Sequence, residues 1–216
     1  MREEVRTAFF DFSVQFEGYV PHMYADIKNL ITCGVGNLID PVSLALAVPF
    51  ESSPGVRATS VEIEKEWSSI KRDPQSARLG HRYSARRTRL RLPREAVAAM
   101  VDRKLMENDA LLLVRFPGQD TWPSDAILAL HSMAWALGPG FARVFTKFSR
   151  LMIAQDFAGA AEECKISERG NPGVIPRNAA NRLLLSNAHA VKAGGLPLEP
   201  LRWPNVVGQQ LTLPTM

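Results

Sequence analysis

The sequence predicts an α+β fold that is mainly helical and carries one small β-hairpin. Over most of the chain apolar residues recur at intervals of three and four, which is the period of an amphipathic helix. Residues 22–39 depart from that period, because strand-forming residues there flank an Asn turn and two glycines. The 216 residues, 46% of them hydrophobic and 22% charged, suffice for a substantial core and exclude global disorder or a fibrous repeat.

A helix is expected first, over residues 2–16. Its apolar face consists of Val5, Phe9, Phe12 and Phe16, which are spaced by three and four residues. Gly18 supplies the stop, and Pro21 lies beyond it. Glu17 therefore falls on the last turn of a helix that docks against a core, which is a rigid mount for a functional carboxyl group.

Residues 22–39 are expected to form a short, twisted hairpin. Lys28 and Asn29 stand at its turn, since Asn tolerates a left-handed backbone. Gly34 and Gly36 leave room for the close approach of another backbone or of a ligand.

The segment after the hairpin, up to residue 91, is expected to combine turns, a helix and a loop or edge strand. Residues 41–54 are rich in turn formers, with one helical turn at most. A capping box formed by Thr59 and Glu62 predicts a helix that ends near residue 71. Residues 75–91 are polar, basic and weakly periodic, so we expect a surface loop or an edge strand there. The alternation of arginine with Thr and Leu favours a strand at the end of this segment.

The second half of the chain is predicted to be helical. Pro93 opens the longest helix, which runs to about residue 114. The next helix, over 124–137, is apolar on most of its circumference, which predicts a central, buried position. Shorter helices are expected over 144–154, 157–164 and 177–192, and Leu201 and Trp203 are expected to anchor the tail.

Basic residues are concentrated in one segment. The net charge is +4, yet residues 71–94 hold nine Lys or Arg against one acid, Asp73, so the local balance is 9 − 1 = +8. Such a patch attracts a polyanion, which is nucleic acid, an anionic membrane or a bacterial wall polymer, or else it only solvates a loop. Nucleic acid is the weakest of these, because Tyr83 alone interleaves an aromatic ring with the arginines.

Neither a disulfide framework nor a metal site is predicted. Cys33 and Cys164 are too few for a framework, and the four histidines fit no metal-ligand spacing. A thiol nucleophile at Cys33, with His22 nearby, is a rival interpretation that lacks a third residue to orient the pair.

The chemistry is concentrated in the segment from residue 16 to 39. Glu17 is followed by eight residues and Asp26, then by five residues and Thr32, and at once by Gly34-Val35-Gly36. Two carboxyl groups and a hydroxyl around one hairpin predict a glycosidase centre, in which one carboxyl protonates the leaving oxygen and the other activates water. The plainer interpretation is a solvated Glu at a helix end, an Asp that caps its own turn and a strand-forming Thr.

This arrangement resembles the active-site segment of the phage-type lysozymes, also called endolysins or muramidases. The resemblance is carried by Glu17, Tyr24, Asp26, Asn29, Thr32, Gly34 and Gly36. It implies a lysozyme-like fold over one domain, 1–216, with an active-site cleft between two lobes. The small lobe would span about 18–60 and the helical lobe about 93–195, with a basic insertion at about 72–92.

The resemblance also implies roles for individual residues. Glu17 would be the general acid, kept protonated by apolar surroundings for which Phe12, Phe16 and Tyr19 are at hand. Asp26 and the Thr32 hydroxyl would hold the attacking water, in an inverting reaction that needs carboxyl groups about 6.5–9.5 Å apart.

Two further residues have two interpretations each. Arg177 would pair with Glu17, or is an ordinary arginine at a helix start. Tyr24 would line the substrate cleft, or only fills the hairpin face.

Two positions depart from the family pattern. Many relatives carry His after the second glycine, where this chain has Asn37, and Asn or Gln near the end of the central helix, where it has Ala136. These departures motivate a second interpretation, a lysozyme-fold module that binds wall glycan without cutting it.

If the resemblance holds, the partner is bacterial peptidoglycan, the protein is a monomer, and no cofactor, nucleic acid or stable membrane insertion is expected. No apolar run approaches the roughly 18 residues of a membrane span, and the N-terminal segment does not look like a Sec signal. The expectation is synthesis in the cytoplasm and action on periplasmic peptidoglycan after release or injection. A phage endolysin and an antibacterial effector with its own inhibitor or immunity protein both fit.

Overall fold

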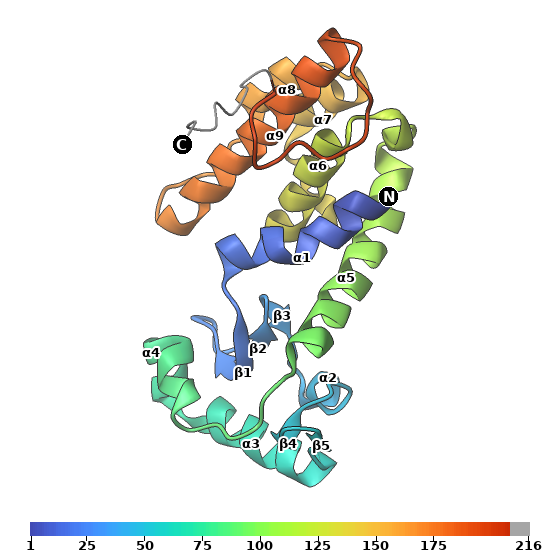
Figure 1. Cartoon of the computed structure of the whole chain (residues 1–216). Coiled ribbons are helices and arrows are strands. Elements are labelled where there is room, and N and C mark those ends of the chain that lie inside the picture. The colour runs from blue at the N-terminus through green and yellow to red at the C-terminus, as the bar shows by residue number, and fades with distance from the viewer. Residues whose placement is uncertain (208–216) are drawn as a thin grey trace, which may run out of the picture. The chain divides into compact units, whose positions relative to one another are not determined.

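The computed structural model describes residues 1–207, and its mainly helical structure with a small antiparallel sheet confirms the predicted α+β class (Figure 1). The chain forms two compact units. One is residues 13–103, and the other combines residues 1–12 with 104–216. The boundaries fall inside two helices, α1 (Glu3–Glu17) and α5 (Arg94–Arg115).

The unit formed by residues 13–103 contains the predicted hairpin. Three antiparallel strands, β1 (Val20–Ala25), β2 (Ile31–Gly34) and β3 (Asn37–Leu38), are ordered β1-β2-β3. Gly18, with φ of 74°, ends α1, and its N–H donates to the carbonyl of Val14. Asn29 has φ of 58°, so the left-handed turn residue predicted from the sequence is confirmed.

The rest of this unit is built from short elements. The capping box is confirmed, because the backbone N–H of Thr59 donates to the Glu62 carboxylate at 2.8 Å and the Glu62 N–H donates to Thr59 Oγ1 at 3.3 Å. These elements are α2 (Val42–Leu46), β4 (Glu51–Ser53), β5 (Val56–Arg57), α3 (Ser60–Arg72) and α4 (Pro74–Ala85).

The prediction of a loop or edge strand over residues 75–91 is wrong, because α4 occupies most of this segment. The Asp73 carboxylate accepts a hydrogen bond from the N–H of Gln75 and caps a helix whose first residue is Pro74. The buried positions of α4 are Ser76 and Ser84, so no apolar period announces the helix. The strand predicted at the end of this segment does not form, and Arg91 makes an isolated antiparallel β-bridge with Glu51 instead.

The other unit is helical over its described residues. The expected buried helix is α6 (Ser124–Leu137), in which every side chain from Ser124 to Ala134 is buried. Helix α9 packs against α6 and α8, and α7 packs against α8 (Figure 1). These helices are α7 (Thr146–Ile153), α8 (Phe157–Glu163) and α9 (Ile175–Ala193).

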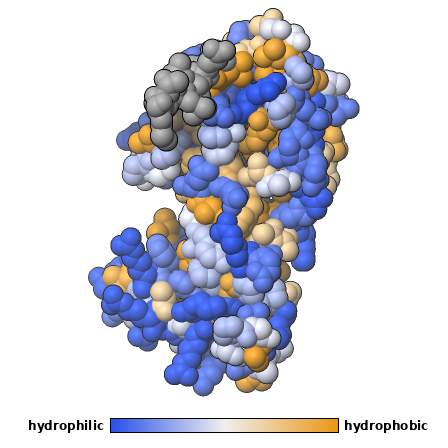
Figure 2. Space-filling view, in the orientation of Figure 1, coloured by the Kyte–Doolittle hydropathy of each residue, from blue (hydrophilic) through white to orange (hydrophobic). Residues whose placement is uncertain are grey.

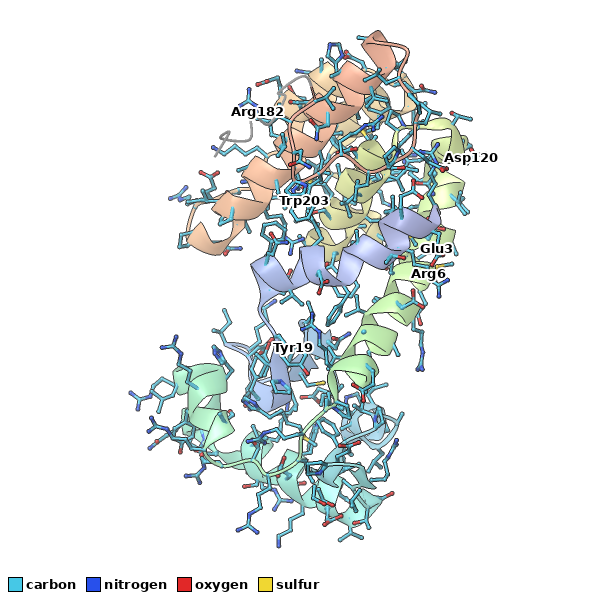
Figure 3. All side chains as sticks on the ribbon, in the orientation of Figure 1. Glu3, Arg6, Tyr19, Asp120, Arg182 and Trp203 are labelled. Atoms are coloured by element: carbon cyan, nitrogen blue, oxygen red, sulfur yellow. The ribbon has the colours of Figure 1, made fainter. Side chains whose placement is uncertain are left out.

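The chain after α9 is held to this unit at Asp125. The buried Asp125 carboxylate accepts hydrogen bonds from the backbone N–H groups of Arg202 at 2.8 Å and Trp203 at 3.0 Å. The Trp203 ring meets Phe12 edge to face, with centroids 5.0 Å apart (Figure 3). The predicted anchor at Trp203 is therefore confirmed. No helix within residues 1–207 is both long and apolar enough to cross a membrane.

Gly34 is the most constrained glycine of the hairpin. Its φ is +65°, and an added Cβ would lie 2.8 Å from Asn37 Oδ1 and 2.9 Å from Val97 Cγ1. Gly34→Ala should lower the free energy of unfolding by about 3 kcal/mol, because backbone strain and overpacking add. Gly55→Ala is the matched control, since φ is +76° but nothing lies within 4 Å. It should cost about 1 kcal/mol. Equal costs in urea denaturation would contradict the packing argument.

Candidate active site

Glu17 stands where the first helix gives way to the sheet. It is the last residue of α1 and is exposed. A Cβ at Gly36 would lie 3.7 Å from Glu17 Oε2, so the carboxyl group reaches the turn between β2 and β3. Gly36, with φ of +73°, is exposed and leaves the space beside this carboxyl group open.

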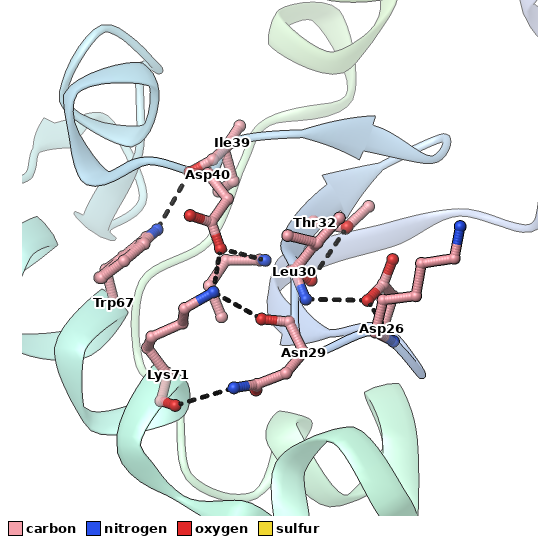
Figure 4. A network of polar contacts seen from close by, with 10 residues as sticks. Asp26, Asn29, Leu30, Thr32, Ile39, Asp40, Trp67 and Lys71 are labelled. Atoms are coloured by element: carbon pink, nitrogen blue, oxygen red, sulfur yellow. Dashed lines mark hydrogen bonds and ion pairs between the residues drawn. The ribbon is translucent and has the colours of Figure 1, made fainter.

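Asp26 and Thr32 both bond to Leu30 at the tip of the hairpin (Figure 4). Asp26 Oδ1 accepts hydrogen bonds from the N–H groups of Lys28 and Leu30, both at 2.8 Å. The Thr32 hydroxyl donates to the carbonyl of Leu30 at 3.4 Å. Asp26 therefore caps its own turn, as the plainer interpretation expected, but it does so with only one of its two oxygens.

Tyr24 connects these groups. It lies directly opposite Thr32 in the register of β1 and β2, so the two side chains share one face of the sheet. Burial, followed by the nearby Cys33, Glu17 and Asp26, raises the pKa of the Tyr24 phenol to about 12. At neutral pH the phenol is a neutral hydrogen-bond donor within electrostatic range of both carboxyl groups.

The apolar enclosure expected for Glu17 stays a prediction. Phe12 packs on Trp203. Tyr19 donates its hydroxyl to the carbonyl of Leu92 at 3.3 Å, and its ring lies beneath the Arg94 guanidinium (Figure 3). The Glu17 side chain is exposed.

The hairpin tip is clasped to α3 by a network that the sequence did not reveal (Figure 4). The Lys71 ammonium donates to Asp40 Oδ2 at 2.5 Å and to the carbonyl of Asn29 at 2.6 Å. The same Asp40 oxygen accepts from the N–H of Ile31 at 3.1 Å, and Trp67 Nε1 donates to the Ile39 carbonyl at 3.0 Å. The turn between β1 and β2, which follows Asp26, is thus held to α3 by hydrogen bonds.

Asn37 and Ala136, the two departures from the family pattern, have different surroundings. Asn37 Oδ1 accepts a hydrogen bond from the N–H of Val35 at 3.1 Å and so closes the turn between β2 and β3. Ala136 is an exposed residue of α6. The asparagine therefore has a structural role in this hairpin.

Arg177 is part of α9, in the other unit. Its side chain is 2% exposed, and it donates to the carbonyl of Ser132 at 3.2 Å and to the Ser132 hydroxyl at 3.3 Å. This binding to α6 is more than an ordinary helix-start arginine makes. The pairing of Arg177 with Glu17 stays a prediction.

The rival thiol nucleophile receives no support. Burial raises the pKa of the Cys33 thiol to about 12, so the reactive thiolate is scarce at neutral pH. His22 hydrogen-bonds through Nε2 to the carbonyl of His81 at 2.9 Å, and burial lowers its pKa. Within residues 1–207, no three His, Cys, Asp or Glu side chains gather as metal ligands would.

Comparison of the chain with protein-family models and with curated protein sequences finds no match to either.

The Lys71 clasp makes a prediction about stability. Lys71→Met should lower the free energy of unfolding by about 1–3 kcal/mol, because the half-buried Asp40 carboxylate and the Asn29 carbonyl lose their partner. Hydrogen exchange of the Leu30 amide should speed up as well. The control is Lys104→Met, which removes an exposed ion pair with Glu107 and should cost less than about 0.5 kcal/mol. A Lys71→Met protein as stable as this control would show that the clasp is dispensable.

Proposed function

We propose that this protein is an N-acetylmuramidase with a lysozyme-like fold, which hydrolyses the β-1,4 bond between N-acetylmuramic acid and N-acetylglucosamine in bacterial peptidoglycan. One observation carries the proposal. The Glu17 carboxyl group reaches the turn after β2, and Asp26 and Thr32 both hydrogen-bond to Leu30 in the same small sheet. Two carboxyl groups and a hydroxyl on one rigid unit are the equipment for acid–base hydrolysis of a glycosidic bond.

Glu17 is the general acid of this proposal. Its side chain is exposed at the end of α1. In this role the carboxyl group would give its proton to the leaving oxygen of the glycosidic bond.

Asp26 and Thr32 would each accept one hydrogen bond from the attacking water. Because Asp26 Oδ1 is used by the turn, Oδ2 is the oxygen that would accept one proton of the water. The Thr32 hydroxyl donates its own proton to Leu30, which leaves its lone pairs to accept the second. A water held by both protons points a lone pair away from the protein, toward the anomeric carbon, and inversion of configuration follows.

Tyr24 would be a contact for the glycan rather than an acid. With a pKa of about 12 its phenol keeps its proton and can donate to a sugar oxygen. Arg177 would pair with Glu17, as the family resemblance implies.

A second candidate is a lysozyme-fold module that binds wall glycan without cutting it. Ala136 favours it, because an alanine cannot hydrogen-bond a sugar at the position where many relatives carry Asn or Gln. Binding to purified sacculi without release of reducing ends would select this candidate.

Replacement of the acid separates the two candidates. Glu17→Gln should lower the rate of muropeptide release from purified sacculi by about 10³-fold, with the fold intact because the side chain is exposed. Thr32→Ala should cost less, about 10–100-fold, since the water loses one of two partners. The control is Glu64→Gln, which changes the net charge by the same amount at another exposed glutamate and should leave the rate unchanged. Mass analysis of the released fragments gives the bond cut, and full activity of Glu17→Gln would sink the muramidase assignment.

Two substitutions of Asp26 distinguish its role in the turn from its proposed role in hydrolysis. Asp26→Asn keeps an oxygen that can accept from Lys28 and Leu30, so stability should change by less than about 0.5 kcal/mol. Asp26→Ala removes both bonds and should cost about 1–2 kcal/mol. Hydrolysis should fall by at least about 10²-fold in both. An active Asp26→Asn would mean that this residue serves the turn alone.

A further inference from the structure

Three exposed arginines lie close together in the sequence of α4 and its C-terminal cap. Arg78 and Arg82 stand on either side of Gly80, whose φ of 69° and ψ of −159° break the helix, and Arg86 follows its last residue. None of them forms an ion pair with a residue of the described chain. We call these three the outer arginines. The surface over this part of the unit is hydrophilic in Figure 2, and its side chains extend away from the ribbon in Figure 3.

Arg87 and Arg91, unlike the outer arginines, form contacts within the unit. Arg87 pairs with Asp73 at 3.3 Å and lies over the Tyr83 ring, 5.2 Å from its centroid. Arg91 donates to backbone carbonyls of the loop after α4, at Ala85, Thr88 and Leu90. Within residues 1–207 the side chains of the outer arginines form neither a hydrogen bond nor an ion pair, so the described fold gives no reason for these three charges.

The chemistry of this face selects a partner that carries repeated oxyanions. All seven basic residues between 74 and 94 are Arg, and the segment has no acid. The guanidinium fork binds phosphate or carboxylate through two donors at once. The serines of α4 are buried, so besides the arginines its exposed side chains with hydrogen-bonding groups are Gln75 and His81.

Two other anionic partners fit less well. Stacking of nucleic-acid bases needs exposed rings, but the Tyr83 ring is covered by Arg87 and its hydroxyl donates to Asp73 at 2.9 Å. Insertion into a lipid surface needs an apolar stripe, and Leu79 is the single large apolar side chain that α4 exposes.

Helix α4 is attached directly to the strand that carries Tyr24. His22 of β1 hydrogen-bonds to the carbonyl of His81 at 2.9 Å, and the rings of Tyr24 and His81 meet edge to face with centroids 6.1 Å apart. A polymer held along the outer arginines would therefore lie beside the candidate active site, within the same unit.

We propose that the outer arginines dock the protein on the phosphodiester polymer that bacterial walls carry on their glycan, next to the strand that the site would cut. This inference rests on the proposed muramidase function, because that function places α4 at the wall. Docking would concentrate the enzyme on its insoluble substrate, and it would weaken with salt as counterions compete.

The test measures binding apart from cleavage, by co-sedimentation of the full chain in the Glu17→Gln background with purified sacculi. One batch keeps its phosphodiester polymer and the other is stripped of it with acid. Arg78→Gln/Arg82→Gln/Arg86→Gln should bind the intact batch at least about tenfold more weakly, with a salt dependence reduced by about two to three charges. The matched control is Arg143→Gln/Arg150→Gln/Arg169→Gln, three exposed arginines of the other unit. In the Glu17→Gln background both triple variants lower the net charge by the same three units, from 4 + 1 = +5 to +2, and the binding of this control should be unchanged.

Three outcomes would overturn the docking surface. They are equal binding to stripped and intact sacculi, equal loss in the two triple variants, and tighter binding to duplex DNA or to anionic lipid vesicles than to intact sacculi. Failure of the proposed function has a different signature. In that case wild type releases no muropeptides, while sedimentation still depends on the polymer and on the outer arginines.

Discussion

The geometry of the hairpin tip depends on the double use of the Asp26 carboxylate. One oxygen accepts two backbone N–H groups and so fixes a turn whose left-handed residue is Asn29. A carboxylate held in this way cannot rotate without giving up both bonds, so its second oxygen has a fixed position. The clasp from Lys71 to Asp40 and Asn29 restrains the same turn from the helix side. A turn that would otherwise be the softest part of the hairpin becomes a rigid support, which any water-holding role requires.

The glycines between β2 and β3 complement this support. Gly34 is needed for packing, because Asn37 and Val97 occupy the space where a Cβ would stand. Gly36 is different, since it meets only the Glu17 carboxyl group, at 3.7 Å, and stays exposed. In this turn Gly34 is therefore packed against other side chains, whereas Gly36 has open space beside the Glu17 carboxyl group. The turn itself explains both glycines, since each has a positive φ, and at Gly36 it also leaves space beside the Glu17 carboxyl group.

The sequence predicted most helices, because their signals are local. The Thr59 capping box and the stop at Gly18 are contained in a few residues, and the structure has them where they were expected. Helix α4 was missed, because it buries Ser76 and Ser84 against the sheet and no apolar period is left to detect. The Asp73 cap followed by Pro74 was a signal that could have found it. The contact of Lys71 with Asp40 joins residues 31 positions apart, and no local pattern announces such a pair. The hydrogen bond from Tyr19 to the Leu92 carbonyl likewise joins residues 73 positions apart.

The proposed function and the outer arginines would answer two demands of an insoluble substrate. If the protein is a muramidase, its rate would depend on how often a glycan strand reaches the exposed Glu17. A polymer that carries both the scissile bond and repeated phosphates would keep the unit near the strand through many brief encounters. Under this proposal, long-range charge would supply proximity, and the carboxyl groups near the open turn at Gly36 would supply the chemistry.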